Sequence, residues 1–235
     1  MAGNDVDDSA RFARLIEPNS IAHLATVLLR WLQDAHDAAR SVQRHRTDEE
    51  RGAWDNTVSF GTDRYQFLVR TAASLTSELP ELVAGDSYRS LLLKLSHVAL
   101  YPFRVDEGPH SPIRAGSDLR TELLSDDSSQ WSLLRRKDLL TGGRELALVP
   151  WTGTENDGCT GLWAGQGALR GNLIDWDWLV ELTAFCIGFD VPATRAPTMP
   201  ITVEGPAAFD QASSELAFRT YPTEDAQIQR LRLRR

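Results

Sequence analysis

A run of apolar residues at helical spacing between residues 19 and 45 constrains the fold of this chain more than any other feature. Asn19 or Ser20 can cap the start of such a helix by accepting a hydrogen bond from a free backbone N–H. Successive members lie three or four residues apart and form one stripe: Ile21, Leu24, Ala25, Leu28, Trp31, Leu32, Ala35, Ala39 and Val42. A helix this long must bury its stripe against other elements, so we expect the rest of the fold to pack on it.

Two further stripes predict two shorter helices before residue 100. The first begins at Thr62 or Asp63 and ends before Pro80, and the second begins at Asp86. The first stripe contains Tyr65, Leu68, Val69, Ala72, Leu75 and Leu79, and the second contains Tyr88, Leu91, Leu92, Leu95 and Val98. Residues 1–100 are therefore predicted to form a helical N-terminal part.

The sequence pattern changes at residue 101. Three prolines and two glycines within residues 101–118 exclude a long helix there. Further on, β-forming residues predict a strand over 145–151 and a returning strand over 159–165, with a third over 168–174. Residues 101–235 are thus predicted to be a mixed part that packs with the helical part as one domain.

A last helix is predicted to begin at Asp175 and to run from Trp176 to about Phe189. Two apolar stripes lie on opposite sides of it: Trp176, Leu179, Val180, Thr183 and Ile187, and Trp178, Leu182, Phe185 and Phe189. A helix that is apolar on two sides is normally enclosed in a core. The predicted fold class is therefore α+β, with an N-terminal helical layer on a small, mainly antiparallel sheet and a buried late helix.

Three glycines in the stretch WAGQGALRGN, at positions 165, 167 and 171, are reminiscent of a phosphate-binding loop. A dinucleotide fingerprint requires a helix that opens within the glycines and binds the pyrophosphate with its N-terminus. The predicted helix begins only at Asp175, and the spacing differs from G-x-G-x-x-G. We therefore interpret the three glycines as a glycine-rich β-turn, and no cofactor is predicted.

Composition and charge narrow the function classes. The net charge of −8 argues against general affinity for nucleic acids or anionic membranes. No stretch approaches the roughly 20 apolar residues of a membrane span, and the acidic N-terminus lacks the features of a secretory signal. The two cysteines, Cys159 and Cys186, lie outside any metal-binding spacing and are expected to be reduced thiols. These features predict a cytoplasmic protein, and the arginine bias of the chain suggests a bacterial one.

Arg40 and His45 have the R-x4-H spacing that occurs in HEPN nucleases, a family of all-helical ribonucleases. The resemblance covers the six residues RSVQRH and implies that the arginine and the histidine act together on an RNA phosphate. On a regular helix the two residues are separated by about 140°, unless the helix ends between them. The alternative is a cationic helix end that interacts favourably with the helix dipole.

Two imidazoles and two carboxylates lie within fourteen residues, at His97, Asp106, Glu107 and His110. Such a group can bind a divalent metal and activate water, which makes a metal-dependent nuclease a second catalytic hypothesis. The residues lack the fixed spacing of a helical metal motif, so exposed loop acids are the alternative.

The chain ends in RLRLRR, in which Arg230, Arg232, Arg234 and Arg235 are spaced so that they can contact phosphates. A nucleic-acid-binding tail is therefore a third hypothesis. The same residues can instead pair with the acidic surface of the protein or form an edge strand.

The preferred hypothesis, a protein-interaction surface, depends on the tryptophans. Trp151, Trp163 and Trp178 belong to a cluster of four in residues 151–178, and tryptophan is enriched where proteins bind one another. Because no catalytic motif is convincing, we expect a non-enzymatic interaction or regulatory protein. It would act through these three side chains as a subunit of a larger complex or as a homo-oligomer.

Overall fold

The computed structural model describes residues 5–48, 57–84, 91–113, 120, 123–124 and 136–186. Helices come first: α1 is Asp5–Leu15, α2 is Ile21–Asp48 and α3 is Thr57–Thr71, extended by the 3-10 helix η2, Ala72–Ser77. The short helix α5, Arg136–Thr141, precedes the long strands, and the 3-10 helix η3, Thr183–Phe185, follows them. Within these described ranges, no helix has the length and hydropathy that a membrane crossing requires.

Among the described residues, six strands form one sheet in the order of the sequence. They are β1 Val83–Ala84, β2 Leu93–Lys94, β3 Val98–Arg104, β4 Glu145–Thr154, β5 Gly158–Arg170 and β6 Leu173–Glu181. Only β3 and β4 pair in parallel, and the other four pairings are antiparallel. The predicted α+β class, with N-terminal helices followed by a mainly antiparallel sheet, is therefore confirmed.

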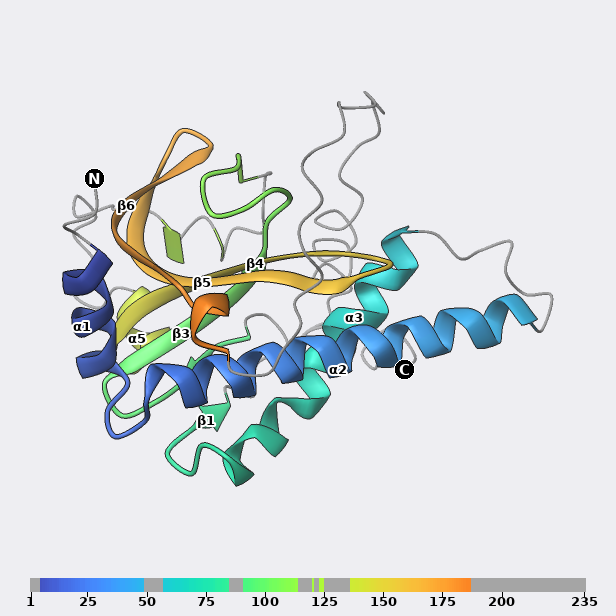
Figure 1. Ribbon diagram of the computed structural model, residues 1–235, viewed down its shortest axis with the longest axis horizontal. Helices are drawn as coiled ribbons and strands as arrows, with labels where there is room; N and C mark the ends of the chain where they lie inside the picture. The colour runs from blue at the N-terminus through green and yellow to red at the C-terminus, as the bar shows by residue number, and fades with distance from the viewer. Residues whose placement is uncertain are drawn as a thin grey trace, which may run out of the picture.

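The sheet separates two hydrophobic cores. The first lies between the sheet and the helices, where the α2 stripe packs against alternate residues of the strands, including Ala147, Val149 and Trp151. The second lies on the opposite face and contains Tyr101 and Leu148. Figure 1 shows α2 running along the sheet with its C-terminal end projecting beyond it, α3 beside that end, and α1 beside β6 at the other end.

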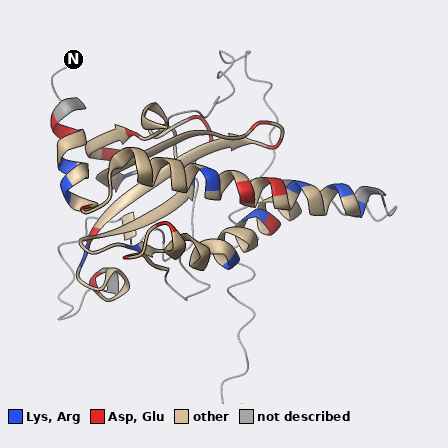
Figure 2. Ribbon diagram, turned by 60° about the horizontal axis from the view of Figure 1, so that its bottom comes forward, with Lys and Arg blue, Asp and Glu red and all other residues tan. Residues whose placement is uncertain are grey.

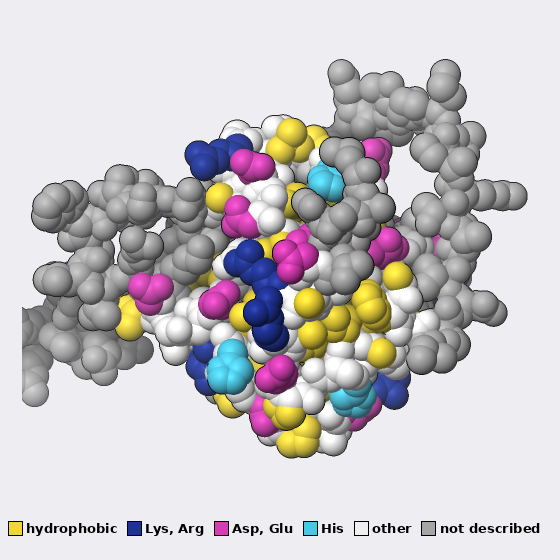
Figure 3. All heavy atoms as spheres, turned by 60° about the vertical axis from the view of Figure 1, so that its left-hand side comes forward, with side chains coloured by type: hydrophobic (Ala, Val, Ile, Leu, Met, Phe, Trp, Pro, Cys, Tyr) yellow, Lys and Arg dark blue, Asp and Glu magenta, His cyan; other side chains and the backbone are white. Residues whose placement is uncertain are grey.

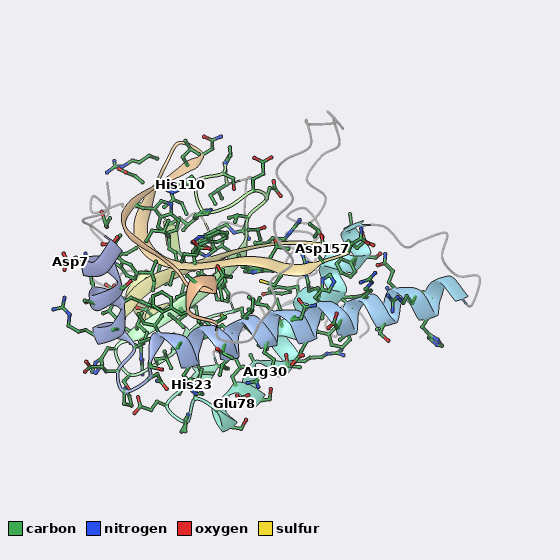
Figure 4. All side chains as sticks on the ribbon, in the orientation of Figure 1. Asp7, His23, Arg30, Glu78, His110 and Asp157 are labelled. Carbon is green, nitrogen blue, oxygen red and sulfur yellow. The ribbon has the colours of Figure 1, made fainter. Side chains whose placement is uncertain are left out.

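Polar contacts fix the helices to one another. The Trp31 indole N–H donates to the Thr71 hydroxyl at 3.0 Å, which joins α2 to α3. His23 and Arg30 lie about two turns apart on the same face of α2. Both contact Glu78, through its carbonyl and its carboxylate respectively (Figure 4). At the sheet edge, the Asp8 carboxylate of α1 accepts a hydrogen bond of 3.3 Å from the Leu179 backbone N–H of β6.

The expected third helix, from Asp86 to about Val98, is wrong. Residues 85–90 lie outside the described ranges, and the following residues form β2 and the start of β3. Leu92 packs in the second core, whereas Leu91 and Leu93 pack in the first. Neighbouring leucines are all buried because both faces of the strand are covered, and this arrangement imitates a helical stripe.

The expected late helix is also wrong, because residues 173–181 form the edge strand β6. Gln166 pairs with Trp178 and Gly167 with Trp176, so Asp177 is the extra residue of a β-bulge. The bulge shifts the alternation by one residue. Trp176 consequently faces the second core and Trp178 the first, which explains the two apolar stripes.

The glycines of WAGQGALRGN serve two structural roles rather than one. Gly171, at φ +66°, lies in the turn between β5 and β6, as the turn interpretation predicted. Gly165 and Gly167 lie inside β5, so for them the interpretation is wrong. A Cβ at Gly167 would lie 2.3 Å from the Asp175 carbonyl oxygen, so this close approach of the strands requires glycine.

Candidate interaction site

The structure places the three predicted interface tryptophans in different environments. Trp151 is 5% exposed and Trp178 is 2% exposed, and both belong to the first core. Trp163 is half-buried. Two of the three side chains therefore lie inside the folded chain, and an interaction surface must be sought among more exposed residues.

Arg40 and His45 are separated by helix geometry. Because α2 continues to Asp48, no helix end intervenes and the two residues remain about 140° apart around the axis. The Arg40 guanidinium donates to the Asn156 carbonyl at 3.1 Å, in the turn between β4 and β5. His45 is exposed. The fold also contains a sheet, unlike the all-helical HEPN nucleases.

The four candidate metal ligands lie beyond opposite ends of one strand. His97 precedes β3, whereas Asp106, Glu107 and His110 follow it. The seven residues of β3 span about 20 Å at roughly 3.3 Å each. Across the described residues, no three His, Cys, Asp or Glu side chains are grouped closely enough to hold a metal ion. Arg230, Arg232, Arg234 and Arg235 lie outside the described residues.

The exposed side of the α2–α3 pair contains a small hollow, which we call the outer groove. Its volume is about 190 Å³. Six residues line it: Val42, Arg46, Asp63, Gln66, Phe67 and Arg70. Val42 and Phe67 are half-buried, whereas Gln66 and Arg70 are exposed. The groove thus combines an apolar part with a polar rim.

An ion pair fixes one side of the outer groove. The Arg46 guanidinium donates two hydrogen bonds to the Asp63 carboxylate, at 2.6 and 3.3 Å. Arg70 is different, because no hydrogen bond or ion pair joins its side chain to another described residue. Asp63 is thus engaged by Arg46, whereas the Arg70 side chain is exposed beside the groove.

The inner side of the same helix pair contains a second arrangement, which we call the cation–aromatic cluster. It consists of His36 from α2, Phe60 and Arg64 from α3, Arg104 from β3 and Trp151 from β4. The Arg64 guanidinium carbon lies 4.7 Å from the Trp151 ring centroid and 5.3 Å from that of Phe60. Arg64 is only 4% exposed, so aromatic faces surround a cation inside the fold.

Burial and like charge both act on the titratable groups of this cluster. Burial, followed by the charge of Arg104, lowers the pKa of Arg64 to about 10, so its guanidinium remains protonated at neutral pH. Burial, followed by the charge of Arg64, also lowers the pKa of His36. The His36 ring contacts the Phe60 ring edge-on at 5.3 Å. The cluster therefore combines charged arginines with a neutral imidazole.

The β4–β5 turn is fixed beside the cluster by three side chains from two elements, α2 and β3. Arg104 donates to the Gly153 carbonyl at 3.3 Å, and Arg40 to the Asn156 carbonyl. The Gln33 side-chain oxygen accepts the Cys159 backbone N–H at 3.0 Å. Burial raises the pKa of the Cys159 thiol to about 12, which keeps it protonated and chemically inert.

Sequence reasoning missed both sites, although a signal for the inner one was present. Phe60, Arg64 and Leu68 lie four residues apart, so the arginine interrupts an apolar stripe at its centre. An arginine in that position is either half-buried at its stem or fully enclosed. The outer groove left no comparable signal, because its residues come from two helices.

No similar protein indicates a function for either site. No known protein family, curated protein or solved structure matches this chain. The residues of the two sites are therefore the basis for the functional argument that follows.

Proposed function

We propose that this chain is a non-enzymatic interaction protein that binds an acidic protein partner through the outer groove. It acts in the cytoplasm of a bacterium, as a subunit of a larger complex or as a regulator of its partner. The observation that carries the proposal is the exposed Arg70, which lacks a partner among the described residues and borders a hollow with an apolar part.

The position of the groove supports binding of a macromolecule. The C-terminal end of α2 projects beyond the sheet (Figure 1), and charged residues of both signs line the projecting part (Figure 2). The groove residues Val42 and Arg46 belong to this C-terminal part of α2. The face at the α1 end, at the other end of the molecule, mixes basic, acidic and hydrophobic side chains (Figure 3).

The chemistry of the groove defines the partner segment. The volume of about 190 Å³ accommodates one or two side chains rather than a large ligand. Val42 and Phe67 favour an apolar side chain, and Arg70 favours an adjacent carboxylate, to which arginine donates paired hydrogen bonds. The expected partner segment thus presents Asp or Glu beside an apolar residue.

Binding to a purified partner tests the proposal. Proteins retained from native cells by the wild-type chain are identified, produced separately and titrated by calorimetry against the wild type and Arg70→Glu. Charge reversal is expected to weaken binding by at least about tenfold, because truncation or reversal at a central arginine typically removes more than about 1.4 kcal/mol. Reversal of the contacted acid in the partner is expected to restore affinity.

Arg14→Glu is the matched control, because Arg14 is also exposed but lies on α1 at the opposite end of the molecule. It makes the same change in net charge and should bind as the wild type does. Equal affinity of the wild type and Arg70→Glu for every purified partner would refute the proposed groove. Equal weakening by both variants would show only a general charge effect.

A further inference from the structure

Three neighbouring side chains of the cation–aromatic cluster contain buried polar atoms or a charge without a partner. Both ring nitrogens of His36 and the Arg104 Nε are buried without a hydrogen bond. The Glu155 backbone acts to raise the pKa of His36, but it is not placed to form a hydrogen bond with the ring. Among the described residues, none forms a hydrogen bond or an ion pair with Arg64. Buried polar groups almost always have hydrogen-bond partners. Three such side chains side by side therefore indicate that a binding partner is missing from this place.

The charges of the cluster identify the missing partner. Arg64 lies beside both Arg104 and His36, and their charges act on one another. The acids that act on this group are Asp37 and Glu155, and both are exposed. The enclosed guanidinium of Arg64 and the half-buried one of Arg104, without an enclosed carboxylate among the described residues, form a site for an anion.

The geometry of the donors supports the same conclusion. Arg64, Arg104 and His36 come from α3, β3 and α2, so three separate elements deliver them to one place. Arg104 uses an Nη group for the Gly153 carbonyl, and its Nε remains available. A neutral imidazole supplies one further N–H. The available groups are mainly donors, which an oxyanion with several acceptor oxygens satisfies.

We propose that the cation–aromatic cluster binds a small divalent oxyanion, phosphate or sulfate, between Arg64, Arg104 and His36. Arginine binds such anions through paired hydrogen bonds, and two positive charges balance the two negative ones. The aromatic rings of Phe60 and Trp151 hold Arg64 in place and exclude water around it. The site is separate from the outer groove, because Arg64 and Arg70 lie about 120° apart around α3.

The β4–β5 turn adjoins this site, because Arg104 donates to the Gly153 carbonyl just before the turn. Its residues 154–157 are exposed, and Figure 4 shows Asp157 at the tip of the hairpin, away from the body of the sheet. The contacts of Arg40, Arg104 and Gln33 fix the turn. A bound oxyanion accepts hydrogen bonds from Arg64, Arg104 and His36 next to the turn. The turn should therefore become more ordered when the anion is present.

Calorimetric titration with sodium phosphate and sodium sulfate tests the proposal, against sodium chloride at matched ionic strength. The wild type is expected to bind either oxyanion with a Kd below about 1 mM. Arg64→Met, which keeps the length of the side chain but removes its charge, is expected to weaken binding by at least about tenfold. Arg70→Met, in the outer groove, is expected to bind both oxyanions like the wild type.

Two further measurements keep the outcome decisive. Where Arg64→Met fails to fold, Arg104→Gln replaces it, and the same loss of affinity is expected. Amide hydrogen exchange in residues 152–158 should slow on addition of phosphate in the wild type only. Absence of oxyanion binding beyond the chloride control, unchanged binding in these variants, or equally tight binding of acetate would overturn the assignment.

Discussion

Two successive residues of α3 show how burial changes the role of a charged side chain. Asp63 lies on the outer groove and forms an ion pair with Arg46, with side chains that are 16% and 39% exposed. Arg64, the next residue, is 4% exposed and contacts aromatic rings instead of an acid. One side of the helix thus satisfies its charge at the surface, and the other encloses a charge without an opposite one.

The difference matters because the two arrangements have different energetics. A partly exposed ion pair contributes little to stability, since water and salt screen it. An enclosed guanidinium loses its hydration, and only part of that loss is offset by cation–π contact. Arg64 is therefore a buried positive charge without an enclosed negative charge beside it, which is why we assign a ligand to the cation–aromatic cluster. The outer pair only shapes the groove in which Arg70 remains available.

The largest expected effect is on the aromatic support of Arg64. Trp151→Ala removes a buried side chain and leaves a cavity beside the guanidinium, so the free energy of unfolding should fall by about 3–5 kcal/mol. Urea-induced unfolding, followed by tryptophan fluorescence and circular dichroism together, measures the change.

Two companion variants sharpen that measurement. Trp151→Phe keeps an aromatic face and should recover most of the lost stability. Trp163→Ala removes a half-buried indole and should cost clearly less than Trp151→Ala. A loss below about 1 kcal/mol for Trp151→Ala, in the range of ordinary surface substitutions, would contradict the enclosed cluster.

The next effect concerns pH. The pKa of His36 is lowered in the folded chain from an ordinary value of 6.5. The unfolded chain therefore binds a proton at a pH where the folded chain does not. The contribution of His36 to stability is full above pH 6.5 and declines as the pH falls below it, by at most about 1.4 kcal/mol per pH unit, until the folded pKa is reached.

His36→Phe isolates this contribution. The variant keeps a ring against Phe60 but cannot bind a proton, so its stability should depend less steeply on pH below 6.5. His97→Gln, at an exposed position, controls for the loss of a histidine. Parallel profiles of His36→Phe and the wild type in urea unfolding across that range would show that His36 is not the group responsible.

The long helix that the sequence predicted correctly has one buried face and one exposed face. α2 has a single apolar stripe, so its period is visible. β4 was predicted for a different reason: it is buried on both faces, and its run of β-forming residues is bounded by a turn. α2 and β4 supply His36 and Trp151 to the inner site.

Where both faces are buried, the period disappears. Residues 91–95 are nearly all apolar because β2 lies between two cores. In β6, the alternation from Ile174 to Trp178 is typical of a strand, but the bulge at Asp177 reverses the face of the later residues. A bulge depends on the pairing partner, so no property of residues 173–181 alone predicts it.

The candidate sites depend on contacts between distant residues. Arg64 and Trp151 are far apart in the sequence, and only the pairing of β3 with β4 brings Arg104 beside them. The expected tryptophan interface named Trp151, which the structure places in the inner cluster. It could not distinguish a tryptophan that supports a buried cation from one on a surface, because both have the same local sequence pattern.

The smallest expected effect concerns the ion pair of Arg46 and Asp63 on the outer side of α3. In a double-mutant cycle with Arg46→Gln and Asp63→Asn, the coupling free energy should be below about 1 kcal/mol, because both side chains retain contact with solvent. It should fall further as salt is raised. Urea unfolding of the four proteins gives the value. A salt-independent coupling above about 2 kcal/mol would place this pair in a dry environment like that of Arg64, and burial would then no longer explain why one arginine is paired and the other is available.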